Sequence, residues 1–161
     1  MKKMLCILLC LLLPAIPALA EENPFIPYVL TAPEGVQMEI NEGSTAFILG
    51  SARVLAMVID RVPDEEPADA IIRLMAQFEP DAVQGEALVL AEGYTGLTAV
   101  NEGRFGEGRD QLIVMILSDG GDLLILSASD LTDDETQAQA LLDQLLTTLA
   151  AEGTGPLMTK E

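Results

Sequence analysis

The sequence predicts an α+β fold, in which an antiparallel sheet of about six to seven strands is flanked by two helices. Apolar runs of strand length recur along the chain and are separated by short glycine-containing segments. Two longer segments instead carry apolar residues at helical spacing. Hairpin-length connections favour antiparallel pairing, and one-sided amphipathic helices would cover the apolar faces of such a sheet.

The first twenty residues predict export. They combine Lys2 and Lys3 with an apolar run from Leu5 to Leu13 and the small residues Ala18 and Ala20. This pattern is typical of a secretory signal peptide with cleavage after Ala20. The apolar run is shorter than the roughly 20 residues of a membrane-spanning helix, so no stable membrane span is expected after cleavage. We therefore expect a secreted or extracytoplasmic protein, with retention of the leader as an anchor left open.

The sequence pattern divides the chain into four predicted regions. Residues 1–20 are the signal peptide, 21–27 a proline-containing lead, 28–152 a single α+β domain and 153–161 a flexible C-terminal tail. Cys6 and Cys10 both lie in the leader, so the processed chain would form no disulfide.

The first half of the domain predicts three strands and a helix. Residues 36–41 alternate apolar and polar, as a half-buried strand does. The apolar runs 45–49 and 54–59 form a hairpin through residues 50–53. A helix is predicted over Pro67 to Phe78, because proline is favoured in a first turn and Pro80 ends the helix. Its expected buried stripe is Ala68, Ile71, Ile72, Met75 and Phe78.

The second half predicts four strands and a closing helix. The strands are residues 87–91, 97–100, 111–117 and 123–127. Thr132 and Glu135 match a capping box that opens the helix, and Gly153 is expected to stop it. The expected buried face of this helix is Ala138, Leu141, Leu142, Leu145 and Leu149.

The glycine-rich stretch 103–110, GRFGEGRD, has the composition of a phosphate-binding loop. Such a loop must open a helix, whose backbone N–H groups meet the anion. A strand-length apolar run follows instead, so we predict a β-hairpin. In the expected register Arg104 falls opposite Asp110.

Composition excludes several chemistries. The chain has no histidine, and beyond the leader it has no cysteine and only Lys160 as lysine. Ser-His-Asp and Cys-His catalysis and the usual zinc sites are therefore excluded. Beyond the leader six basic residues face 26 acidic ones, a net charge of about -20, which disfavours nucleic acid and anionic lipid.

Carboxylates remain as candidate ligands or catalysts. Asp119 and Asp122 are expected in a turn, and Asp130, Asp133, Asp134 and Glu135 at a helix start, so their ordinary structural roles account for them. Tyr94 lies between two glycines and is expected to pack, with an exposed contact role as the alternative. No catalytic, cofactor-binding or metal-binding residue and no cofactor is assigned.

Several segments together resemble the PsbP-like (DcrB-like) family of small exported proteins. They are residues 32–36 (APEGV), the hairpin 47–59, the helix after a proline, residues 93–100 (GYTGLTAV), residues 121–129 (GDLLILSAS) and the closing leucine-rich helix. The resemblance implies an antiparallel sheet sandwiched by helices and an accessory or binding role without a shared catalytic residue.

We therefore expect a non-catalytic accessory or binding domain of the cell envelope or secreted fraction, and not an enzyme. Its partner would be a protein or envelope component, contacted through a sheet face or strand edge. The alternatives are a carboxylate-dependent secreted hydrolase and a weak calcium-binding protein. The partner and the oligomeric state are left open.

Overall fold

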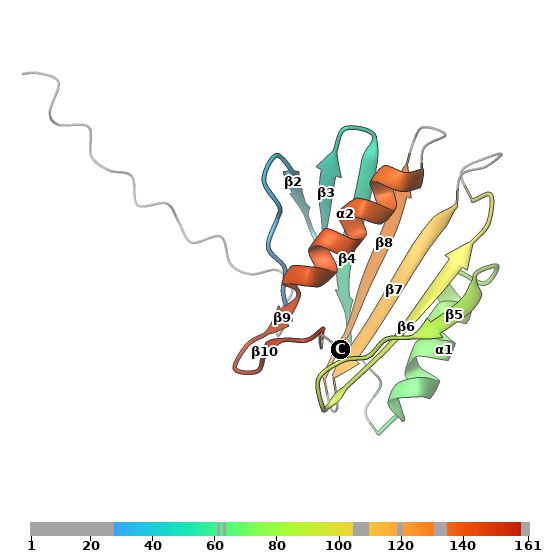
Figure 1. The fold of residues 1–161 in the computed structure, drawn as a ribbon. Helices are drawn as coiled ribbons and strands as arrows, with labels where there is room; N and C mark the ends of the chain where they lie inside the picture. Colours follow the sequence, from blue (N-terminus) through green and yellow to red (C-terminus); the bar gives the residue numbers. More distant parts are fainter. Residues whose placement is uncertain are drawn as a thin grey trace, which may run out of the picture.

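The structure, a computed structural model, describes residues 28–60, 62, 64–104, 110–118, 121–130 and 135–158. The described residues form a seven-stranded antiparallel sheet with one helix on each face and a three-stranded sheet at one end (Figure 1). The predicted α+β fold is confirmed. The predicted signal peptide and the lead 21–27 lie outside the described residues.

The large sheet consists of two antiparallel units that meet at its centre. Its strand order is β2-β3-β4-β8-β7-β6-β5, and every neighbouring pair is antiparallel. The strands are β2 (Gln37–Asn41), β3 (Ser44–Leu49), β4 (Ala52–Ile59), β5 (Val83–Ala87), β6 (Tyr94–Asn101), β7 (Gln111–Ser118) and β8 (Leu123–Asp130). The pairing of β4 with β8 joins the two units, so β2 and β5 form the outer edges.

The small sheet brings the two ends of the described chain together. β9 (Ala150–Ala151) pairs with both β1 (Tyr28–Val29) and β10 (Gly155–Pro156). β10 and the buried Leu157 come from the region that the sequence analysis assigned to a flexible tail. Residues 155–158 are instead part of the fold, because Leu157 packs in the core under the second helix.

The two helices cover different halves of the sheet. α1 (Pro67–Phe78), with the bounds predicted for it, packs on β6 and β7. α2 (Glu135–Thr148) lies on the opposite face and packs on β4 and β8 (Figure 1). Strand side chains alternate between the two faces, which gives one hydrophobic core under each helix.

All five residues expected on the buried face of α2 are buried, four of them on the helix and Leu149 directly after it. The helix ends at Thr148 and not at Gly153, because the next residues leave the helix to form β9. Gly153 lies in the turn between β9 and β10, with φ 77°. Thr132 of the predicted capping box lies outside the described residues.

The predicted stripe of α1 is partly wrong. Ala70, Ile71 and Leu74 are buried against the sheet, whereas Ala68 is exposed and Ile72 is 52% exposed. Apolar residues occupy more than half of this helix, so their spacing fits more than one face. The contact with β6 and β7 decides which of these faces is buried.

The strand predicted at residues 87–91 is displaced. β5 ends at Ala87, and the next residues leave the sheet plane to cover Gly96 of β6. The Leu88 N–H donates to the Gly96 carbonyl at 2.9 Å, and the Ala91 N–H donates to the Leu157 carbonyl at 2.9 Å. The segment therefore crosses between the two sheets with Leu88, Leu90 and Ala91 partly buried and Val89 60% exposed.

Candidate functional site

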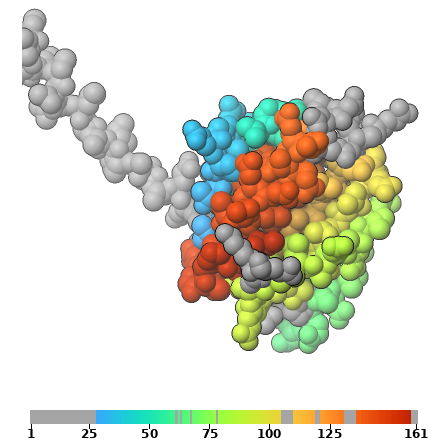
Figure 2. Space-filling model, viewed as in Figure 1, coloured from blue at the N-terminus to red at the C-terminus, as the bar shows by residue number. Residues whose placement is uncertain are grey.

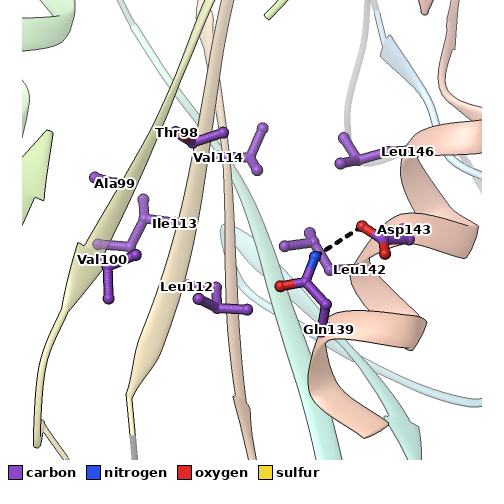
Figure 3. A pocket seen from close by; sticks show the side chains of 10 residues that line it. All are labelled: Thr98, Ala99, Val100, Leu112, Ile113, Val114, Gln139, Leu142, Asp143 and Leu146. Atoms are coloured by element: carbon purple, nitrogen blue, oxygen red, sulfur yellow. Dashed lines mark hydrogen bonds between the residues drawn. The ribbon is translucent and has the colours of Figure 1, made fainter. Parts of the chain in front are cut away.

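The staggered helices leave one half of each sheet face without a helix. On the α2 face, the uncovered half is formed by β6 and β5, which lie beside α2 in the space-filling view (Figure 2). A groove of about 250 Å³ runs between α2 and the surface formed by β6 and β7 (Figure 3). Its lining comes from residues 98–100, 112–114 and one side of α2.

The floor of the groove is apolar. Thr98 and Val100 of β6 and Leu112 and Val114 of β7 alternate with residues that face α1, and therefore point to the α2 side. Figure 3 shows Leu112 and Val114 between β6 and the helix. Ile113 belongs to the core under α1, so its side chain lies on the far side of the sheet.

The wall of the groove is a strip of α2 at helical spacing. Leu142 and Leu146 are buried at its base, while Gln139 and Asp143 are exposed at the mouth. The Gln139 amide Nε2 donates to Asp143 Oδ1 at 2.9 Å (Figure 3). The groove therefore combines an apolar base with one carboxylate at its mouth.

One end of the groove is closed by the crossing segment. Gly96 is the next residue of β6 on the α2 face beyond Thr98. A Cβ placed on Gly96 would lie 2.8 Å from Leu90 Cδ1 and 3.1 Å from Leu88 Cδ1. These leucines thus fill the space over β6 that a larger residue would take, and the apolar floor continues only from Thr98 onward.

A second polar cluster lies on the α1 side. Glu79, the residue that caps the C-terminus of α1, accepts hydrogen bonds from Asn101 Nδ2 at 3.2 Å and from Gln111 Nε2 at 3.0 Å. Gln111 Nε2 also lies 2.7 Å from Ser127 Oγ. A carboxylate at a helix C-terminus is destabilised by the helix dipole, and the hydrogen bonds from the two amides offset this cost. Among the described residues, Gln111 Oε1 has no hydrogen-bond partner, and it is buried from solvent, so a ligand could not reach it.

The predicted partner of Arg104 is wrong. β6 and β7 end on the pair Asn101–Gln111, a register that places residue 102 opposite Asp110. Arg104 Nε instead lies 3.8 Å from Glu79 Oε2, and the Asp110 carboxylate accepts from the Gly103 N–H at 2.8 Å. Residues 105–109 of the predicted hairpin loop lie outside the described part of the chain.

The other sequence candidates occupy structural positions. Tyr94 packs edge-on against Tyr28, with ring centroids 6.4 Å apart, as the packing interpretation expects. The Asp122 carbonyl accepts from a buried tyrosine, and Asp130 is buried at the end of β8. Residues 119, 133 and 134 lie outside the described residues. Within the described ranges, no three carboxylate, histidine or cysteine side chains are grouped to hold a metal, and no helix has the length and apolarity to cross a membrane.

Tyr28 is a buried polar residue that the sequence analysis did not single out. Its hydroxyl lies 2.7 Å from the Asp122 carbonyl and 3.1 Å from the Ile116 carbonyl, and it accepts from the Ser118 N–H at 3.2 Å. Burial raises the pKa of this phenol to about 12. The residue joins β1 to the end of β7, which is a structural role that no local sequence signal announces.

Comparison with known proteins supports the fold. No model of a known protein family matches the sequence, and no curated protein matches it. The structure is similar to cyanobacterial PsbP (CyanoP) from Synechocystis sp. PCC 6803, with 17% identity, a TM-score of 0.52, and coverage of 78% of this chain and 86% of that one. It is also similar to LpqN of Mycobacterium tuberculosis, a protein involved in cell envelope biogenesis, with 17% identity, a TM-score of 0.51 and coverage of 82% and 83%. The chain therefore has a PsbP-like fold, as the resemblance implied.

Proposed function

We propose that the chain is an exported, non-catalytic accessory domain that binds a partner protein of the cell envelope through the groove between α2 and the β6–β7 surface. The leader-like N-terminus supports export. The fold is shared with LpqN, which is itself involved in cell envelope biogenesis. At 17% identity the shared fold does not carry over a binding site from LpqN, and this chain's own residues define the proposed one.

The groove carries the proposal. Its volume of about 250 Å³ is below the roughly 300–1,000 Å³ of pockets that enclose drug-sized molecules. It has room for one or two aliphatic side chains of a partner, which would contact Val100, Leu112 and Leu142. Asp143 at the mouth and the net charge of -18 favour a basic residue beside those side chains.

The residue types in the groove support binding without catalysis. Hydrolysis of a glycosidic bond needs two carboxyl groups that flank the scissile bond. The groove presents one carboxylate, Asp143, together with the amide of Gln139 and the hydroxyl of Thr98. The chain also lacks the histidine that would activate such a hydroxyl as a nucleophile.

A groove-filling variant tests the proposal. Val100→Trp places a large ring on the floor, and Ile72→Trp places the same ring on the exposed side of α1, on the other face of the sheet. The exported protein would be used to capture partners from its own cell envelope, and the Kd of each identified partner would then be measured for all three proteins. We expect Val100→Trp to weaken binding roughly tenfold or more, because excluding one buried side chain of the partner from the groove costs about 1–2 kcal/mol or more.

Ile72→Trp should bind as the wild type does, and thermal unfolding would show that both variants are folded. Equal Kd values for Val100→Trp and the wild type would refute the groove as the binding surface. Turnover of a glycan or peptide substrate that is lost on Asp143→Asn would refute the non-catalytic assignment.

A further inference from the structure

The two edges of the large sheet differ in how they are protected. At β5 the register with β6 shifts between Gln84 and Ala87. Thr98 Oγ1 lies 2.9 Å from the Glu86 backbone N and 3.1 Å from its carbonyl O, so a side chain takes part in the pairing of this edge. Irregular edges of this kind resist the addition of another strand.

The β2 edge has none of these protections. All five of its residues pair with β3 in one unbroken register, from Gln37 opposite Ile48 to Asn41 opposite Ser44. The strand contains no proline and no lysine, and all five residues are exposed. Within the described residues, no backbone hydrogen bond from outside the pairing with β3 reaches residues 37–41. A regular, uncovered edge is a template for a further strand.

The side chains of β2 are arranged for a partner of defined chemistry. Met38 and Ile40, which are 41% and 47% exposed, lie on the α2 face opposite Phe47 and Thr45 of β3. Glu39 lies on the other face, between Gln37 and Asn41. A strand added here would therefore meet apolar side chains on one face and a carboxylate on the other.

We propose that β2 receives an extended segment of a partner protein as an added strand, and that this segment alternates apolar and basic residues. Its apolar side chains would pack beside Met38 and Ile40, and a lysine or arginine would lie beside Glu39, where opposite charges on neighbouring strands stabilise pairing. A second copy of the chain is disfavoured as the occupant, because both copies carry a net charge of -18. This inference rests on the proposed function, since it names a second contact of the same binding domain.

A charge-reversal pair tests the inference. The probe is a short end-capped peptide of alternating valine and lysine, and the reference probe alternates valine and glutamate. Glu39→Lys reverses the charge at the centre of β2, and Glu86→Lys makes the same change in net charge on exposed β5. Binding is measured by fluorescence anisotropy at fixed salt, and backbone amide exchange is measured with and without the peptide.

We expect the wild type to bind the lysine peptide and not the glutamate peptide. Glu39→Lys should weaken binding of the lysine peptide on the order of fivefold more than Glu86→Lys does, because only Glu39 is a cross-strand neighbour. Amide exchange should slow within residues 37–41 and not within 83–87. Equal weakening by the two variants, or slowing at β5, would show general charge attraction and overturn the inference.

Absence of lysine-peptide binding would also overturn it, as would self-association that protects residues 37–41 without peptide. Because Val100→Trp leaves β2 unchanged, it should bind the peptide as the wild type does. If Val100→Trp loses partner binding and the wild type does not bind the peptide at β2, the proposal for the groove is retained and the proposal of an added strand at β2 is refuted.

Discussion

Replacing Tyr28 with phenylalanine tests whether one buried hydroxyl holds the N-terminal strand β1 against the end of β7. The ring is fully buried, and its hydroxyl is shared between the Ser118 N–H, at 3.2 Å, and the carbonyls of Asp122 and Ile116. Phenylalanine keeps the packing against Tyr94 but leaves these backbone groups without the hydroxyl. Because unpaired buried groups cost about 1–3 kcal/mol, we expect Tyr28→Phe to lower the free energy of unfolding by that amount at neutral pH.

The pH profile sharpens this prediction. The pKa of Tyr28 rises from 10.0 to about 12 because burial disfavours the charged phenolate. The folded state therefore keeps this proton while the unfolded chain loses it, so the wild-type protein loses stability as the pH rises from 10 toward 12. Two pKa units correspond to about 2–3 kcal/mol, and the loss is absent in Tyr28→Phe.

Urea unfolding at several pH values up to about 11.5 measures both effects. The stability difference between wild type and Tyr28→Phe should be constant below pH 9 and shrink above pH 10. Tyr94→Phe is the matched control, because the Tyr94 hydroxyl makes no hydrogen bond in the described part of the chain, and it should change the unfolding free energy by less than about 0.5 kcal/mol. A difference between wild type and Tyr28→Phe that stays constant from pH 8 to 11.5 would show that the hydroxyl is not buried as described.

Two further substitutions test the packing of α1 and of the crossing segment. Glu79→Ala should lower the unfolding free energy by about 1–3 kcal/mol in a denaturant titration, because the buried amides of Asn101 and Gln111 lose their acceptor. Glu66→Ala at the other end of α1, where no side-chain cap bond forms within the described residues, should cost less than about 1 kcal/mol. Equal costs for the two variants would contradict the reasoning. Gly96→Ala should cost about 1–3 kcal/mol in thermal or urea unfolding, because the new Cβ would press on Leu88 and Leu90. When Leu90 is also replaced by alanine, the loss of unfolding free energy caused by Gly96→Ala should be smaller. An unchanged loss would show that the new Cβ does not press on Leu90.

Local sequence signals predicted the elements whose evidence is contained within a few residues. The bounds of α1 follow from Pro67 and Pro80, which permit a helix between them and end it. The buried face of α2 follows from leucines at helical spacing on a helix that is otherwise polar. β2 follows from an apolar–polar alternation, and β3, β4 and the strands from β6 to β8 follow from apolar runs of strand length between turn residues.

Contacts between distant segments decided the rest. Residues 87–91 have strand-like composition, but they cross over β6 because Gly96 leaves space for Leu88 and Leu90. The network around Glu79 joins residues that are 22 and 32 positions apart in the sequence, so no motif could reveal it. Spacing alone could not choose the buried side of α1, since its apolar residues fit more than one face.

The sequence by itself determined that this is an acidic α+β chain with a leader-like start, because composition and periodicity are local properties. The tertiary structure decided where the two surfaces that we propose for partner binding lie. In the described part of the chain, the groove exists because α2 packs on β4 and β8 and not on β6, and β2 is available because the strand order places it at an edge of the sheet. Both features arise from how the elements are placed relative to one another, which no single segment encodes.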